Sequence, residues 1–419
     1  MVNKSVIFLF KYIFFILCAA CIILNSGYAL ATGNNKLLAI SLAILTIVLF
    51  AIYIVKKKKF DIKKKTEQIV IILNLSVLVA FIINYDLSSF LEYLRYFMFV
   101  LSGYFVAKLI TFNQFIYYFS RIMRFVAISS ILMFLSIKFG IISYLPIAEN
   151  GYGVSYYNTW FFLTQVSTNL RNSAIFWEPG LYAGFLALAL AFEVIFLSKT
   201  EKNLKYILFF FVAMITTQST TGYLYMILIF ILMVSKNANG FKQSLIFITA
   251  ILTILYLYWN FNAVLNHLVA YSPQVFQKLQ SKNLSYTDRV LNPIIDIYIL
   301  LHYPLGCGIG KLTSLVQQIS NDLVIMVHSR TSTLTFFFAA FGFIGGLGFN
   351  ATWLYGFIKN NDLNSIRKVT LVVLFILIAS SSPLNSNMAI WILVFVFFES
   401  VQKHVKDLNH KRIRIKLSK

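Results

Sequence analysis

The sequence predicts an all-α, polytopic integral membrane protein with about 12 transmembrane helices and two long outer loops. The 419 residues are 59% hydrophobic and only 12% charged, with a mean hydropathy of +0.78. A soluble domain has about 25% charged residues, so this chain cannot belong to that class. Its apolar runs also recur at about the 20 residues that a helix needs to cross a bilayer.

Twelve apolar runs are separated by turns or by charged connections. The first contains Lys11 and lacks a small-residue cleavage site, so we interpret it as a retained span and not as a signal peptide. The polar run TTQSTTG at 216–222 divides one apolar stretch into the seventh and eighth spans. The expected spans are 6–24, 37–55, 68–84, 90–110, 115–137, 179–198, 205–219, 220–235, 244–259, 331–357, 369–383 and 387–400.

The net charge of +22 lies beside the spans, as in KKKKFDIKKK at 56–65 and the basic tail at 403–419. This location indicates contact with anionic membrane lipids and not with nucleic acid. Alternate connections differ in charge, which predicts that both termini are cytoplasmic. The basic connections are 56–66, 199–205, 236–243 and 359–368, whereas 25–36, 85–89, 216–222 and 384–386 contain one Lys between them.

Two expected outer loops, at 138–178 and 260–330, are much longer than the other outer connections. Long loops in a compact protein usually carry function. Both are rich in aromatic and amide side chains, which suit carbohydrate because rings stack on sugar faces and amides bind hydroxyls. Tyr157, Trp160 and Trp177 are the candidate sugar contacts. A belt of aromatic residues at the membrane interface is the alternative.

The segment RNSAIFWEPG at 171–180 places Arg171 and Glu178 directly before the sixth span. Pro179 suits the first turn of a helix, so we expect the helix to begin at Glu178–Pro179 with its unpaired amides facing outward. An anion held there by Arg171 would be favoured, and Glu178 could orient an arginine or act on a hydroxyl proton. An interfacial arginine that merely extends to the headgroups is the alternative.

Ionisable residues at membrane depth usually face a cavity or each other. Glu92 and Arg95 are three residues apart in the fourth span, a spacing that favours a structural ion pair on one helix face. A substrate-binding role for Arg95 is the alternative.

The second long loop holds Arg289, His328 and Arg330. No second His or Cys stands at ligand spacing from His328, so we expect neither a metal nor a cofactor. The glycines of PLGCGIG at 304–310 predict a tight turn and not a dinucleotide loop, because no βαβ unit surrounds them. The glycines of the tenth span, 342–348, predict close packing on a neighbouring helix.

Together, RNSAIFWEPGLYAGFL, the STTG turn, an Arg followed by PLGCGIG, and a His leading into FGFIGGLGF resemble the O-antigen polymerase family of bacterial inner membranes. Its superfamily includes O-antigen ligases and protein O-oligosaccharyltransferases. The similarity covers about 160–350. It implies a GT-C-like fold, an inner-membrane location and a polysaccharide chain-length regulator as a partner.

The resemblance also implies the chemistry. Such polymerases join undecaprenyl-diphosphate-linked oligosaccharide repeats on the periplasmic face, without a metal and with inversion at the anomeric carbon. Arg171 and Arg289 match the family's arginines and His328 matches its histidine, while Glu178 lies in the matched EPG. Arg330 does not clearly belong to the pattern and is assigned only to substrate binding.

Two other functions remain open. An O-antigen ligase, which transfers polysaccharide to lipid A-core, has no motif that separates it from a polymerase. A lipid-linked oligosaccharide flippase would also have about twelve spans, but it needs charged residues deep along a central path. The nearly charge-free span centres and the long outer loops favour an enzyme.

Overall fold

The structure is a computed structural model that describes residues 16–58, 60–141, 145–159, 162–166, 170–197, 204–235, 284–322, 332–360 and 363–417. Within these ranges the chain is mostly helical, with one small antiparallel sheet. Five helices are long and apolar enough to cross a membrane, and several shorter ones are similarly apolar. This composition is compatible with a membrane-embedded protein.

The helices follow the apolar runs of the sequence. Residues 16–24 are helical, and two short 3-10 helices occupy Ala29–Ala31 (η1) and Leu87–Ser89 (η2). The α-helices are α2 (Asn35–Val55), α3 (Lys65–Asn84), α4 (Phe90–Leu109), α5 (Phe112–Lys138), α6 (Pro179–Ile195), α7 (Leu204–Thr216), α8 (Thr220–Ser235), α12 (Leu284–His302), α13 (Ile309–Asp322), α14 (Thr333–Ile358), α15 (Ser365–Ser381) and α16 (Met388–Leu417).

Ten of the expected spans correspond to helices, α2 to α8 and α14 to α16, with about the expected bounds except that α16 continues to Leu417, through the expected basic tail. The first is described only from residue 16, and the ninth, at 244–259, lies outside the described residues. The total of twelve spans therefore stays a prediction. The expected loop at 260–330 is partly helical, because it contains α12 and α13.

Helix α6 lies at the centre of one half of the bundle. All 17 of its residues are buried, which a helix that is apolar on every side requires. It packs against α5, α7, α8 and α15. In the other half, α16 packs on α4 and α14, and the rings of Phe337 and Phe349 stack with centroids 4.0 Å apart.

The peripheral helices keep apolar side chains on their outer faces. Ile40 and Ile47 of α2, Leu75 of α3 and Leu132 of α5 are exposed. Exposed apolar area of this extent, spread over several long helices, is expected where lipid surrounds a bundle.

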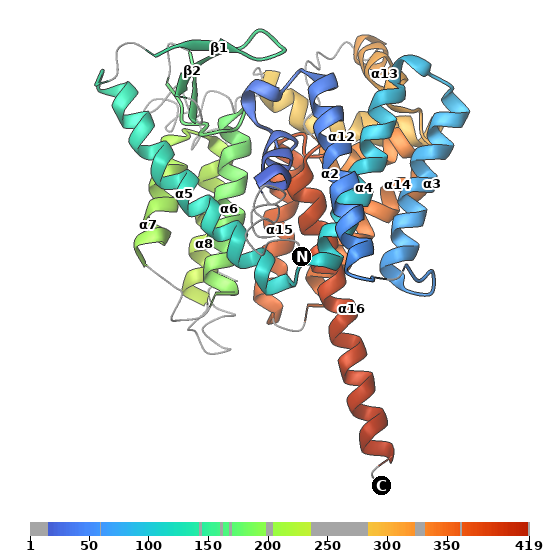
Figure 1. The fold of residues 1–419 in the computed structure, drawn as a ribbon. Coiled ribbons are helices and arrows are strands. Elements are labelled where there is room, and N and C mark those ends of the chain that lie inside the picture. The colour runs from blue at the N-terminus through green and yellow to red at the C-terminus, as the bar shows by residue number, and fades with distance from the viewer. Residues whose placement is uncertain are drawn as a thin grey trace, which may run out of the picture.

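The sheet lies at one end of the bundle, the end at which α13 also lies on the far side, whereas α16 extends from the opposite end (Figure 1). Strands β1 (Ile147–Glu149), β2 (Ser155–Thr159) and β3 (Phe162–Gln165) pair antiparallel in that order. We call the sheet's end the outer end, following the orientation expected from the charges, and the other the inner end.

Several connections expected on the outer side are bonded to one another at the outer end. The Gly151 amide donates to the Thr32 carbonyl (2.9 Å), and the Trp177 amide donates to the Gly27 carbonyl (3.1 Å). The Met388 amide donates to the Asn25 carbonyl at 2.8 Å. Three of the connections expected on the outer side therefore meet at one end of the bundle.

The turn at 303–309 packs into a break in α14. At Gly342 the backbone has φ of +71°, which only glycine adopts without strain. The Phe343 amide donates to Pro304, and the amides of Cys307 and Gly308 donate to carbonyls of α14. The tight turn is confirmed. Gly342 breaks the helix, whereas Gly348 does serve close packing, on Leu73 of α3.

Candidate functional site

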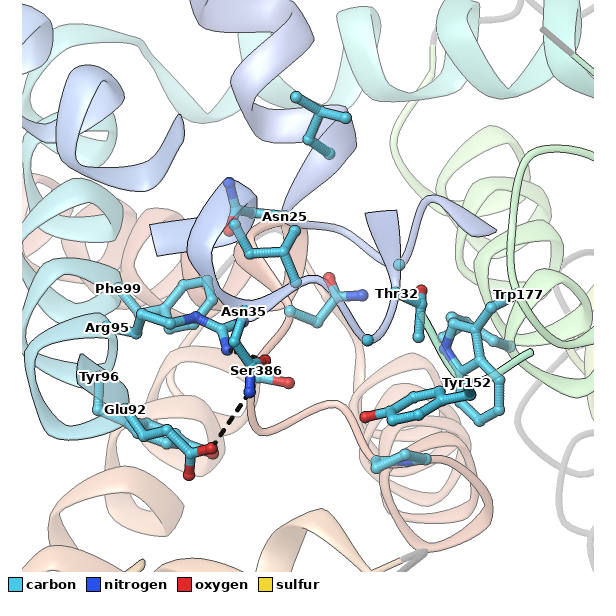
Figure 2. A pocket seen from close by; sticks show the side chains of 17 residues that line it. Asn25, Thr32, Asn35, Glu92, Arg95, Tyr96, Phe99, Tyr152, Trp177 and Ser386 are labelled. Carbon is cyan, nitrogen blue, oxygen red and sulfur yellow. Dashed lines mark hydrogen bonds between the residues drawn. The ribbon is translucent and has the colours of Figure 1, made fainter. Parts of the chain in front are cut away.

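A cavity of about 230 Å³ opens at the outer end, among segments distant in sequence (Figure 2). Its walls come from the end of the first helix, the N-terminal turns of α2 and α4, the loop at 150–153, the residues before α6 and the α15–α16 connection. Arg95 and Glu92 lie on one side of it, and Trp177 and Tyr152 lie on the other.

Arg95 is the buried cation of this cavity, with 9% of its surface exposed. Its Nη1 donates to Asn35 Oδ1 at 3.2 Å, and its guanidinium lies 6.0 Å from the centre of the Phe99 ring. Its Nε is buried and has no hydrogen-bond partner in the part of the chain that the structure describes. Among the described residues, no carboxylate forms a salt bridge with it.

The expected ion pair between Glu92 and Arg95 is not formed directly. Instead Asn35 lies between them, because its Nδ2 donates to Glu92 Oε1 at 3.5 Å while its Oδ1 accepts from Arg95. A spacing of three residues places two side chains on one helix face, but here both side chains bond to Asn35 of α2 and not to each other. Figure 2 shows the amide beside both groups.

Amides from two other connections also line the cavity. Asn25 donates through Nδ2 to the Ser41 hydroxyl at 2.7 Å, but no described residue donates to its buried Oδ1. Asn387 donates to the Ser26 carbonyl at 2.8 Å, which ties the α15–α16 connection to the first helix. Sequence reasoning missed Asn25, Asn35 and Tyr152, since no spacing links them.

Arg171 lies at the C-terminal end of α7. Its Nε donates to the Thr217 carbonyl and its Nη2 to the Gln218 carbonyl, both at 3.1 Å. Carbonyls at a helix end lack partners within the helix and carry partial negative charge, so a guanidinium stabilises them. The contact joins the RNSAIFWEPG segment to the polar turn at 216–222.

Glu178 is the N-cap residue of α6 and Pro179 its first residue, which confirms the predicted start of this helix. The Glu178 side chain makes no capping bond. On β2, the buried Tyr156 hydroxyl donates to the Trp177 carbonyl at 3.0 Å. Burial, with the charge of Glu178 adding to it, raises the pKa of Tyr156 to about 12.

The other expected site residues divide into three groups. Tyr157 lies on β2, paired with Ile147 and Thr164, and does not line the cavity. Arg289 belongs to α12, but its side chain lies outside the described set. Trp160, His328 and Arg330 lie outside the described residues. The convergence of Arg171 with Arg289 and His328 therefore stays a prediction.

Two groups of buried charges lie in the bundle, one where α3 begins and α4 ends and one at Arg124, near the middle of α5. Lys108 lies between Glu67 (3.2 Å) and Glu399 (2.7 Å), and all three side chains are at most 10% exposed. Arg124 of α5 also makes a two-pronged contact with the buried Glu193 of α6. The sequence shows these charges singly, whereas their pairing needs helices that are distant along the chain.

Comparison with known proteins adds no relative: no family model, curated protein or solved structure matches the chain.

Proposed function

We propose that the protein is a membrane glycosyltransferase of the O-antigen polymerase type. It joins undecaprenyl-diphosphate-linked oligosaccharide repeats at the outer face of the bacterial inner membrane. The supporting observation is the cavity at the outer end, where expected outer connections meet around amide, aromatic and cationic side chains. Such a lining suits a sugar that carries an acidic group.

In the proposed reaction, a hydroxyl of the incoming lipid-linked repeat attacks the anomeric carbon of the growing chain. A C–O bond forms on one face while the bond to the lipid diphosphate breaks on the other, so the configuration inverts. The leaving diphosphate takes the bonding electrons. We assign neutralisation of its charge to Arg171 and Arg289, and acceptance of the hydroxyl proton to His328. The α7–α8 turn fixes the direction of the Arg171 guanidinium.

The test is deletion of the gene followed by electrophoresis of the cell's lipopolysaccharide. A single repeat on the core indicates a lost polymerase, whereas bare core indicates a lost ligase or flippase. Plasmids encoding Arg171→Lys, Arg289→Ala or His328→Ala should fail to restore the ladder at matched expression. Arg121→Gln, at an exposed position of α5, is the control that should restore it. Normal ladders from both Arg171→Lys and His328→Ala would exclude these residues from the site.

The proposed orientation places 138–178 and 260–330 outside the cytoplasm. Single cysteines at Tyr157 and Lys278, in a background without Cys18, Cys21 and Cys307, should react with an impermeant maleimide in intact spheroplasts. Reaction only after permeabilisation would reverse the topology.

A flippase for lipid-linked oligosaccharide is the second candidate, and one observation favours it. Charged side chains do occur inside the bundle, in the cluster of Glu67, Lys108 and Glu399 and in the Arg124–Glu193 pair. Transporters carry such groups along their path. A flippase defect would leave undecaprenyl-linked single repeats on the cytoplasmic side, whereas a polymerase defect would leave them accessible from outside.

A further inference from the structure

We propose that the cavity beside Arg95 binds an oxyanion of a ligand, a phosphate or a carboxylate, through the Arg95 guanidinium. This proposal deepens the function proposed above and rests on it for the identity of the ligand, a sugar-bearing lipid. The binding itself is argued from the charge, the hydrogen bonds and the lining of the cavity.

The first argument is the charge of Arg95. A buried guanidinium, such as that of Arg95 with 9% of the residue exposed, is costly unless an anion or several acceptors compensate it. Its only hydrogen bond in the described part of the chain goes to a neutral amide oxygen, that of Asn35. The carboxylate one turn away, Glu92, is half-buried and is engaged by the same amide. A bound oxyanion would supply the missing negative charge.

The second argument is the unused hydrogen-bonding capacity. Nε of Arg95 is a buried donor with no acceptor among the described residues. Leaving such a donor unpaired costs about 1–3 kcal/mol, so it calls for an acceptor from water, an ion or a ligand. The planar guanidinium matches the two oxygens of a carboxylate or a phosphate. Asn35 holds the opposite edge of the group and so fixes its direction.

The lining of the cavity around Arg95 also points to a ligand. The cavity, at about 230 Å³, far exceeds the roughly 10–15 Å³ that one water molecule needs. Opposite Arg95 it offers the rings of Trp177 and Tyr152, and Asn25 Oδ1 is a buried acceptor with no donor in the described ranges. A ligand hydroxyl can donate a hydrogen bond to such an acceptor, and a sugar ring can stack on the aromatic side chains of this wall. The oxyanion is therefore expected on a sugar or directly beside one.

The experiment measures binding to the full-length protein in nanodiscs of neutral lipid. Four probes are titrated separately: inorganic pyrophosphate, galacturonate, galactose, and nanodiscs that contain a polyprenyl diphosphate. Wild-type protein should bind at least one of the acidic probes and should not bind galactose. Arg95→Gln should weaken that binding by about tenfold or more, the value of one charge-assisted hydrogen bond. Arg121→Gln, an exposed arginine of α5, should leave it unchanged.

The acidic probes distinguish the sources of the oxyanion. Binding of pyrophosphate or of the lipid diphosphate assigns a phosphate, and binding of galacturonate alone assigns an acidic sugar. Failure of all acidic probes to bind, or equal binding to wild type and Arg95→Gln, would overturn the proposal. If Arg95→Gln does not fold, the wild-type protein still tests the proposal, because it should bind an acidic probe and should not bind galactose. A deletion strain that makes normal lipopolysaccharide, while the purified protein shows Arg95-dependent binding, is a further outcome. That combination would reject only the proposed function.

Discussion

Helix α4 carries a buried cation near each end, and the two cations have opposite surroundings. At the inner end, Lys108 lies between the carboxylates of Glu67 and Glu399. The hydroxyls of Tyr104 and Thr66 donate to the same carboxylates, at 3.2 and 2.6 Å. At the outer end, Arg95 has one amide oxygen as a partner and lines a cavity.

The difference separates a structural charge from one available to a ligand. The Lys108 cluster joins α3, α4 and α16, and its ammonium faces two carboxylates, so it has no need of an external anion. Within the described ranges, Arg95 joins α2 to α4 through an amide and keeps one donor unused. Equal burial of a charged side chain therefore does not imply an equal role.

Removal of the inner cation should have the largest effect on stability. Lys108→Met leaves two carboxylates buried without an ammonium, which should cost about 3–5 kcal/mol of unfolding free energy. Thermal unfolding in detergent measures the change, with Lys138→Met at an exposed position as the control. The triple variant with Glu67→Gln and Glu399→Gln should recover most of the loss. Wild-type stability of Lys108→Met alone would contradict the structural role.

Arg171 is the next test, because it combines a structural contact with a proposed catalytic one. Arg171→Ala removes both hydrogen bonds to the end of α7 and should cost about 2–3 kcal/mol. Arg171→Lys can retain one of them and should cost less, yet it should still fail to extend polysaccharide because it loses the bidentate fork. Unfolding temperature and ladder length, measured on the same variants, separate the two roles. Equal ladders for Arg171→Lys and wild type would leave only the structural role.

Tyr156 should make a smaller, pH-dependent contribution to the unfolding free energy. Tyr156→Phe removes the hydrogen bond to the Trp177 carbonyl, worth about 1 kcal/mol. Because the folded pKa of about 12 exceeds the unfolded value near 10, this group's contribution is complete below pH 10 and is lost as pH rises through 12. Unfolding curves between pH 8 and about 12 should therefore fall more steeply for wild type than for Tyr156→Phe. Parallel curves would contradict the assignment.

Arg95 should have the smallest effect on stability in the absence of ligand. Arg95→Gln removes a buried charge that lacks a counter-ion, so the unfolding free energy should change by less than about 1 kcal/mol, in either direction. The same unfolding assay used for Lys108→Met gives the comparison. A loss as large as that of Lys108→Met would show that Arg95 is paired like the inner cation, and the contrast between the two ends would disappear.

The sequence by itself determined the local and periodic features of this protein. Apolar runs of sufficient length predict helices, so ten expected spans correspond to helices from α2 to α16. Pro179 after Glu178 predicted a helix start, and the glycines at 304–310 predicted a turn, because both residue types restrict the backbone locally. The charges of the connections predicted two groups of loops, because the charge of each connection depends only on its own residues.

Tertiary structure alone decided which polar groups meet. Asn35 separates Glu92 from Arg95, although their spacing favours a direct pair, because the first turn of α2 lies against α4. Lys108 and Glu399 are paired across 291 positions, a contact that no period or motif encodes. The number of possible partners for a buried charge grows with the number of helices. Only the packing of those helices selects one, and among the described residues it pairs no carboxylate with Arg95.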